Sequence, residues 1–317
     1  MRSMERLSRE VWDTDLWCGD TAMIRQIFAV VKFNFLGFFH NPKVILTFLL
    51  GIVLSFLLSE KVMRIVTYFQ TPMQAAEPFI WTFGDTTAVL CSALLLLLIF
   101  SDLPKLSDAS MFYLIRTTKK RWLTAQLIYI ISVTGIYMGF MMIVTCVLCA
   151  KDSFIGNMWS KTAALLGYSE MGREMQIPST VRVMESIQPY GCAIQVIMLL
   201  FGYALTMGFL VLLCNMAFGK KAGILAGLCY SLYGFLMDPE ILGKMMGLEP
   251  FEMYKVRTAT GWISPLNHAV YGRHNFGYDH LPTVGQSCMV FFLILCILAF
   301  LSFRVLKRYP LSKSRVI

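Results

Sequence analysis

The sequence predicts an all-α polytopic membrane protein in which an N-terminal interfacial helix precedes six transmembrane helices and both termini are cytoplasmic. Of the 317 residues, 57% are hydrophobic and only 15% are charged, whereas about a quarter of the residues in soluble domains are charged. The hydrophobic residues fall in long runs separated by charged strips, which is typical of bilayer-spanning helices. This composition disfavours a cytosolic enzyme, a disordered chain and a disulfide-rich secreted module. One transmembrane domain over residues 23–303 is expected.

The first 39 residues contain two different segments. Residues 1–22 mix arginines with acidic residues and lack the apolar core and small-residue cleavage site of a signal peptide, so we expect a cytoplasmic strip. Residues 23–39 are rich in aliphatic and aromatic side chains but include Arg25, Lys32 and Asn34. Such a segment is too polar for the bilayer core and suits a helix in the headgroup layer.

Six apolar runs follow the predicted interfacial helix. The first comes directly after the Asn41-Pro42 break and is clean only as far as Leu58. Because so short a helix cannot cross a hydrocarbon core of roughly 30 Å, we extend the span past Glu60 to Val66. The predicted spans are residues 44–66, 79–100, 123–150, 190–218, 222–237 and 286–303, and residues 304–317 form a basic cytoplasmic tail.

Lysine and arginine are divided unevenly between the two sides of the predicted bundle. The N-terminal segments with Lys43, the loop 101–122, the turn at Lys220 and Lys221, and the tail together carry 18 of the 28 cations. Cytoplasmic loops of membrane proteins carry an excess of these residues, so this side is predicted to be cytoplasmic. The topology also explains the net charge of +9 without nucleic acid as a partner.

The two longest loops, residues 151–189 and 238–285, lie on the predicted outer side. Apolar side chains in the second loop recur at helical spacing between Ile241 and Leu248. We expect such segments to lie on the outer leaflet or to dip into it where surrounding protein pairs their backbone groups.

The chain has no recognisable catalytic motif. It contains no GxxxxGK[ST] phosphate-binding loop, so we do not expect it to hydrolyse ATP by itself. No predicted span holds a serine with a histidine, a pair of aspartates on facing spans, or an HExxH motif, as intramembrane proteolysis requires. We predict no catalytic residue and no cofactor. A polytopic membrane enzyme acting on lipid or peptide remains the alternative, and a structural or sensory membrane subunit is a third possibility.

Histidine and cysteine are the residues that most often bind metals. His268, His274 and His280 recur every six residues in the second outer loop, which permits a metal cluster. Interfacial polar histidines are commoner, so no metal site is predicted. Eight of the nine cysteines lie in or beside apolar runs and are interpreted as small buried hydrophobic residues.

Asp85 is the one carboxylate clearly inside a predicted span. A charge within a membrane helix is a functional candidate by default. Because Asp85 lies near the outer end of its span, snorkelling or a hydrogen bond with Thr86 or Thr87 accounts for it equally well.

Glycines spaced four residues apart mark candidate helix-packing positions, because small residues let membrane helices approach closely. We expect this packing within one subunit rather than in a dedicated dimer face. The glycines are Gly135 and Gly139 in the third span and Gly219, Gly223 and Gly227 at the entry to the fifth.

The cytoplasmic loop between the second and third spans is the most informative segment. Asp108 is placed to cap a short helix, Met111 to Ile115 give that helix an apolar face, and Arg116 to Arg121 supply four cations at its end. An ordinary positive-inside loop explains the charges but not the aromatic helix.

This loop resembles the corresponding loop of type-2 ABC exporter permeases, in which a short helix ends in arginine, a small polar pair, basic residues and then Trp-Leu. The segment 33–46, the six-span count and the long loop before the last span also resemble that family. Gln126 stands where the family often has a lysine. The matching residues are Arg116, Thr117-Thr118, Lys119 to Arg121 and Trp122-Leu123, with Ile263 to His268 in the last outer loop.

The resemblance implies a permease subunit of an ATP-driven exporter in a bacterial cell membrane. It implies separate ATPase subunits, a second permease subunit, identical or different, and surrounding membrane lipids as partners, with the first and fifth spans near the subunit seam. It assigns ATPase coupling to loop residues Asp102, Pro104, Asp108, Met111, Phe112, Tyr113, Leu114, Arg116, Lys119, Lys120 and Arg121.

Overall fold

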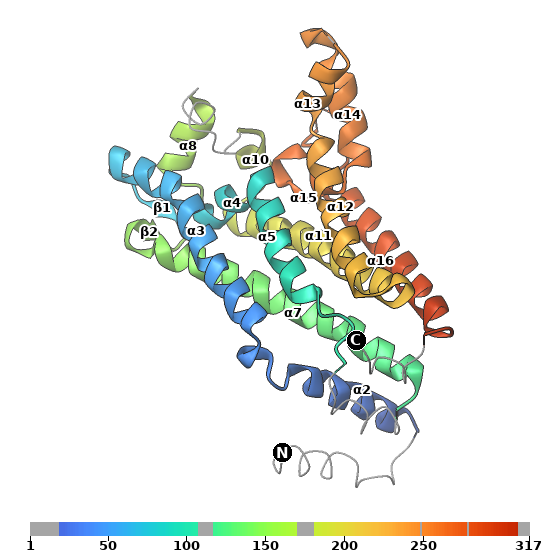
Figure 1. The fold of residues 1–317 in the computed structure, drawn as a ribbon. Helices are drawn as coiled ribbons and strands as arrows, with labels where there is room; N and C mark the ends of the chain where they lie inside the picture. The colour runs from blue at the N-terminus through green and yellow to red at the C-terminus, as the bar shows by residue number, and fades with distance from the viewer. Residues whose placement is uncertain (1–18, 107–116, 170–180, 248, 278, 310–317) are drawn as a thin grey trace.

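A computed structural model describes residues 19–106, 117–169, 181–247, 249–277 and 279–309. Over these residues the chain is almost entirely helical (Figure 1), which confirms the predicted helical class. A small parallel pair of strands, β1 (Met73–Gln74) and β2 (Ser153–Phe154), is the exception in this part of the chain. Most of the predicted N-terminal strip and of the basic tail lies outside the described residues.

The helices follow the predicted order. The predicted interfacial helix corresponds to α2 (Gly19–Phe35) and the 3-10 turn η1 (Phe38–His40). The apolar runs form α3 (Pro42–Phe69), α4 (Glu77–Phe83), α5 (Thr86–Phe100), α7 (Lys119–Leu148), α11 (Pro189–Phe218), α12 (Lys220–Leu236) and α16 (Val284–Leu306). The two loops predicted to be outer form η2 (Ala150–Asp152), α8 (Lys161–Tyr168), α10 (Val181–Ser186), α13 (Pro239–Met245), η3 (Pro250–Glu252), α14 (Met253–Ile263), α15 (Pro265–Ala269) and η4 (Tyr271–Arg273).

Local side-chain caps explain where several of these helices begin. The Asn41 side chain accepts a hydrogen bond from the Lys43 backbone at the start of α3, and Pro42 occupies a first-turn position where no N–H is needed. At α16, Thr283 and Gln286 form a reciprocal capping box. The break at Asn41-Pro42 is therefore a helix start, as expected.

Four helices in the described part of the chain are individually long and apolar enough to cross a membrane, namely α3, α7, α11 and α16. The pair α4 and α5 makes a fifth candidate if it is counted as one broken span. The remaining predicted span, α12, has 17 residues, or about 25 Å at 1.5 Å per residue, which is shorter than the roughly 30 Å core. The count of six spans remains a prediction.

The predicted second span, residues 79–100, is wrong as a continuous helix. It is divided into α4 and α5, which meet at an angle of 84°. Asp85 lies at the division and its side chain accepts a hydrogen bond from the Thr87 backbone at 3.0 Å, capping α5. A capping aspartate takes a non-helical backbone, which is why the apolar run bends here.

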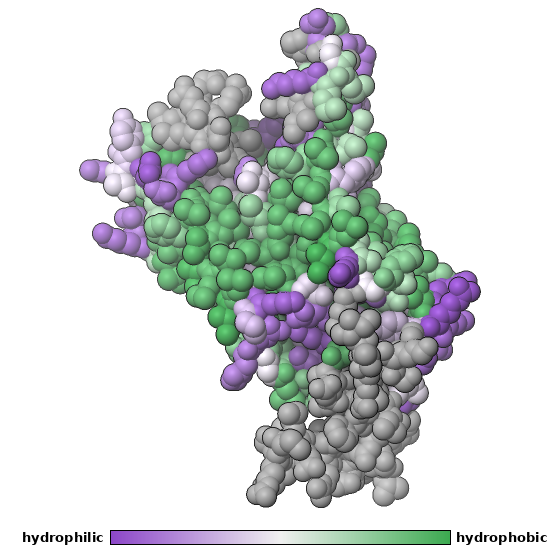
Figure 2. All heavy atoms as spheres, viewed as in Figure 1, coloured by the Kyte–Doolittle hydropathy of each residue, from purple (hydrophilic) through white to green (hydrophobic). Residues whose placement is uncertain are grey.

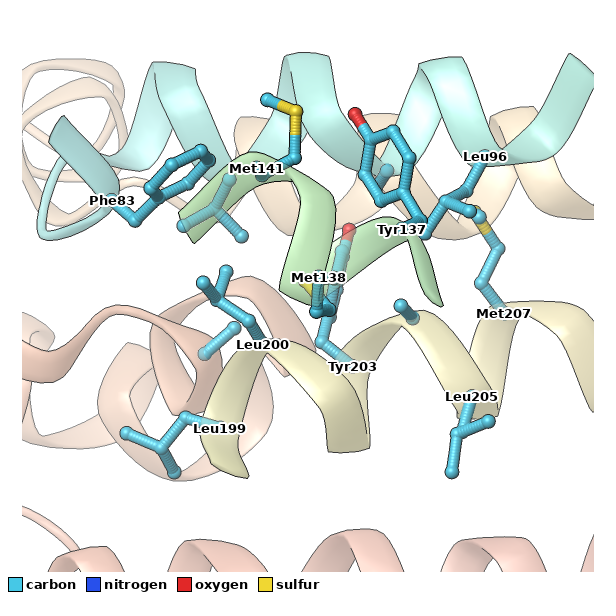
Figure 3. Close-up of a cluster of buried hydrophobic side chains, with 14 of the residues drawn as sticks. Phe83, Leu96, Tyr137, Met138, Met141, Leu199, Leu200, Tyr203, Leu205 and Met207 are labelled. Carbon is cyan, nitrogen blue, oxygen red and sulfur yellow. The ribbon is translucent and has the colours of Figure 1, made fainter. Parts of the chain in front are cut away.

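The centre of the bundle is α11, which packs against α5, α7, α12 and α16. Figure 3 shows Leu200 and Tyr203 of α11 beside Met138 of α7 in the buried cluster. Two thirds (67%) of the most apolar window of α11 is buried, compared with 17% for α16. The helix α11 is therefore a core element, whereas α16 presents most of its surface outward.

Hydrophobic side chains form a belt around the middle of the molecule, and hydrophilic side chains gather at both ends (Figure 2). At one end α2 lies across the end of the bundle against α7 (Figure 1). At the other end α13 and α14 form a hairpin that projects away from the other helices (Figure 1). In the same loop, α15 packs against α11, α12 and α5, and η4 packs against α11.

Candidate functional site

The predicted coupling loop is described at its two ends. Asp102 and Pro104 lie in the segment that follows α5, and Lys119, Lys120 and Arg121 begin α7. The positions between them lie outside the described residues, namely Asp108, Met111, Phe112, Tyr113, Leu114 and Arg116. The candidate site is therefore built from the residues that anchor the loop.

Asp102 is the centre of an ionic cluster at the start of the loop. Its carboxylate lies 2.5 Å from Lys43 Nζ and 3.9 Å from Lys105 Nζ. Asn41 donates a hydrogen bond to the same carboxylate at 3.5 Å, and Lys43 Nζ also donates one to Ser101 at 3.0 Å. The residues that start α3 are thus joined to the end of α5.

The charges in this cluster shift the pKa values of Asp102 and Lys105. Burial alone raises the pKa of Asp102, but the hydrogen bond from Lys43 and the charge of Lys105 outweigh it, so the pKa falls below its ordinary value. Burial lowers the pKa of Lys105, and the charge of Asp102 opposes that shift. Asp102 is therefore ionised at neutral pH.

Uncharged side chains from two further helices hold the backbone of the same segment. Gln126 of α7 accepts a hydrogen bond from the Lys105 N–H at 3.2 Å and donates one to the Lys105 carbonyl at 3.5 Å. Asn215 of α11 donates to the Leu103 carbonyl at 2.7 Å and accepts from the Gly223 N–H of α12 at 2.9 Å. The segment 101–105, here called the loop root, is therefore bonded to α3, α7 and α11, and through Asn215 to α12.

Sequence reasoning missed most of these anchors. Lys43 was counted only as a cytoplasmic charge, and Gln126 was noted only because it departs from the family pattern. Asn215 is an amide inside an apolar run, and such residues are costly in a membrane unless they are hydrogen-bonded. Its position in the run could therefore have indicated that it has a polar partner.

The second end of the loop is bonded to α2 and to the segment after α16. Arg121 donates a hydrogen bond to Gln26 of α2 at 2.5 Å. Lys119 donates one to the Tyr309 carbonyl at 3.2 Å, and the Tyr309 ring stacks on Trp122. Both described ends of the loop are thus fixed to the helical bundle.

The predicted packing glycines divide into two groups. A side-chain carbon added to Gly223 would lie 2.2 Å from Asn215, and one added to Gly227 would lie 2.5 Å from Leu97 of α5. Gly139 and Gly219 have no such neighbour within 4 Å, and Gly135 is 3.9 Å from the nearest. The close approaches of α12 are made to α11 and α5 of the same chain, so these glycines give no reason to place α12 at a subunit seam.

A buried carboxylate that the sequence did not reveal lies at the other end of the bundle. Glu77 of α4 has no exposed surface. It accepts hydrogen bonds from the backbone and hydroxyl of Ser160, at 2.7 and 2.6 Å, and from the Gln74 backbone at 3.0 Å. Glu77 thus ties the first outer loop to the segment between α3 and α4.

The outer histidines form a hydrogen-bonded chain around Ser287. His274 Nδ1 lies 3.0 and 3.1 Å from two backbone carbonyl oxygens, so it carries the ring proton, and Nε2 accepts from the Ser287 hydroxyl at 2.9 Å. Because that hydroxyl has one proton, it must accept from His268 Nδ1, 2.7 Å away. His268 Nε2 lies 3.1 Å from the Trp262 carbonyl and donates there only when the ring is protonated.

Burial lowers the pKa of both imidazoles, in His274 to about 4, while the Trp262 carbonyl opposes the shift in His268. His280 is exposed and lies outside this chain of hydrogen bonds. Among the described residues no three histidine, cysteine or acidic side chains are grouped as a metal site would require. The six-residue histidine spacing is therefore accounted for by two histidines that bond a serine.

Together these features define a helical membrane protein with a polar cluster at each end of an apolar belt. Searches against models of protein families, curated proteins and solved structures found no match to this chain.

Proposed function

We propose that this chain is the permease subunit of an ATP-driven exporter, paired with a second permease subunit and driven by separate ATPase subunits. The observation that supports it is the loop root, which is bonded to α3, α7 and α11 and, through Asn215, to α12. A motor protein outside the membrane can move spans only through an element fixed to several of them. The loop root meets this requirement.

In the proposed mechanism the ATPase binds Met111 to Leu114 as apolar anchors, and the cations from Arg116 onward hold the loop at the headgroups or pair with acidic groups on the ATPase rim. Movement of the bound ATPase displaces the loop root. Lys43 transmits this displacement to α3, Gln126 to α7, and Asn215 to α11 and α12. The pathway then opens or closes between two copies of the bundle, because one bundle without an internal repeat supplies half of a two-fold pathway.

The test separates recruitment of the ATPase from transmission. A tagged chain purified in mild detergent is expected to retain an ATPase, and the double substitution Phe112→Ala and Tyr113→Ala is expected to lose it while the chain still inserts. Asn215→Leu is expected to retain the ATPase but to abolish the change that ATP and vanadate cause in tryptic cleavage of the outer loops. Asn157→Leu, the same substitution at the other end, is the matched control.

Two results contradict the proposal. Full ATPase retention by the double aromatic variant makes the loop an ordinary positive-inside connection. If Asn215→Leu retains the ATPase and its tryptic cleavage still changes with ATP and vanadate, movement is not transmitted through the loop root.

The orientation has its own test. Cysteines introduced at Ser169 and Lys255 are expected to react with an impermeant maleimide added to intact cells, and cysteines at Ser110 and Ser312 are not. Labelling at Ser312 in sealed cells would reverse the topology and remove the argument for cytoplasmic docking.

The alternative of a membrane enzyme receives little support from the contacts of Ser287 with His268 and His274. Ser287 is completely buried between His268 and His274, each of which is only 2% exposed. The far sides of both rings face backbone carbonyls. A nucleophile needs access to its substrate, and this hydroxyl has none in the described arrangement.

A further inference from the structure

A groove of about 350 Å³ lies between the first turn of α7 and the last turns of α16. Its cations are Lys119, Lys120, Arg304 and Lys307, and its apolar wall includes Phe300 and Phe303. None of the described residues lining it is acidic. Figure 2 shows hydrophilic side chains where α16 ends, beside the apolar belt.

Four cations around one groove repel each other unless an anion lies between them. Two of them are held in place by other groups: Lys119 donates to the Tyr309 carbonyl at 3.2 Å, and the Arg304 guanidinium lies 5.1 Å from the Phe300 ring centroid. An ammonium has three donors and a guanidinium five, so these contacts leave donors for an anion. The groove is therefore suited to a phosphate group.

An apolar strip continues from the groove along α16. Leu293, Ile297, Phe300 and Arg304 follow at helical spacing on one face. The three apolar side chains are 54%, 57% and 57% exposed. From Arg304 to Leu293 is about 16 Å along the helix, which is half of a hydrocarbon core of roughly 30 Å. The strip thus has the length of one leaflet.

We propose that an anionic phospholipid binds this surface, with its phosphate among the four cations and an acyl chain along Phe300, Ile297 and Leu293. The phosphate of such a lipid contacts the cations and its acyl chain contacts the apolar strip, whereas a free phosphate would contact only the groove. Basic pockets at membrane boundaries bind anionic headgroups, because each cation near the surface attracts them. This site requires the chain to lie in a membrane but does not require an ATPase.

The test measures lipid binding to the purified full chain in a neutral detergent by native mass spectrometry. Phosphatidylglycerol is expected to bind at least about tenfold more tightly than phosphatidylcholine. The double substitution Lys120→Gln and Arg304→Gln is expected to reduce that preference about tenfold or more, since two cations are removed. The matched control, Lys244→Gln with Arg257→Gln at the other end of the molecule, is expected to retain it.

Further measurements separate the contributions of charge, folding and the acyl chain. Arg304→Lys preserves the charge and is expected to keep most of the preference, which separates loss of charge from loss of folding. Soluble glycerol 3-phosphate at hundredfold excess is expected not to displace phosphatidylglycerol. Ile297→Ser is expected to weaken the binding of both phosphatidylglycerol and phosphatidylcholine. Equal binding of the two lipids, retained preference in the double variant, or displacement by glycerol phosphate would each overturn the lipid site.

Discussion

The Asp102 ion cluster at one end of this helical bundle and the Glu77 network at the other end hold their polar groups in different ways. At the loop root, Asp102 is paired with Lys43 and Lys105, and the three side chains are between 21% and 40% exposed. At the other end, Glu77 is completely buried and its described partners are neutral N–H and O–H donors. The His268, Ser287 and His274 chain is likewise buried and built from neutral groups.

The difference shows how each end is suited to a different task. A partly hydrated ion cluster loses little when its partners shift, because water and neighbouring charges compensate. A buried network has no such compensation, so every lost hydrogen bond leaves a buried polar group without a partner. The Asp102 ion cluster is therefore suited to a moving part, and the buried Glu77 and histidine networks fix the positions of the loops at the other end.

The largest effect is expected for Glu77→Ala. The substitution leaves three buried donors, two from Ser160 and one from Gln74, without an acceptor. The expected cost is about 3 to 5 kcal/mol, seen as a lower midpoint of thermal unfolding in detergent. Glu60→Ala removes a carboxylate from the exposed pair with Arg64 and serves as the control. Equal midpoints for the two variants would contradict the comparison.

The pH dependence of stability is the next largest effect. Because the pKa of His274 is lowered by burial to about 4, the unfolded chain, with its pKa near 6.5, takes up a proton first as the pH falls. The contribution of this residue is complete above about pH 6.5 and is lost progressively towards pH 4, by about 3 kcal/mol. His274→Gln is expected to flatten the midpoint-against-pH curve in that window relative to wild type. An identical slope in wild type and variant would show that His274 does not titrate differently on folding.

A smaller effect is expected from packing at α12. Gly223→Ala places a methyl group 2.2 Å from Asn215 Oδ1 and 2.6 Å from the Val211 carbonyl, so α12 must move away from α11. Overpacking of this kind costs about 1 to 3 kcal/mol. Gly139→Ala, which meets no atom within 4 Å, is expected to be neutral or stabilising in the same unfolding measurement. The reverse order of the two variants would show that α12 packs differently.

The smallest effect on stability is expected for Lys43→Ala. The ion pair with Asp102 is partly exposed, so its loss costs about 1 kcal/mol or less, and the difference from wild type shrinks in high salt. The same variant is nevertheless expected to weaken the response of the outer loops to ATP, because Lys43 joins α3 to the loop root. A stability loss as large as that of Glu77→Ala would make the loop root a rigid network like those of the outer end.

The sequence predicted the helices well and the polar networks poorly. The apolar runs gave α3, α7, α11, α12 and α16 to within a few residues at most ends, because length and hydropathy are local properties. The run 79–100 is interrupted by Gly84 to Thr87, but hydropathy does not record that Asp85 takes an extended backbone there and caps a new helix. Asp102 was named as part of the loop that the resemblance assigns to ATPase coupling, but its partner Lys43 is 59 residues away.

What the sequence determined by itself is a helical membrane protein with an asymmetric distribution of charge, because the cost of placing each side chain in lipid or water depends mainly on that side chain. What only the tertiary structure decided is which polar groups meet. Glu77 and Ser160 are 83 residues apart, and Asn215 and Leu103 are 112 apart. A hydrogen bond between such groups depends on the packing of whole helices, and no local pattern in the chain encodes that packing.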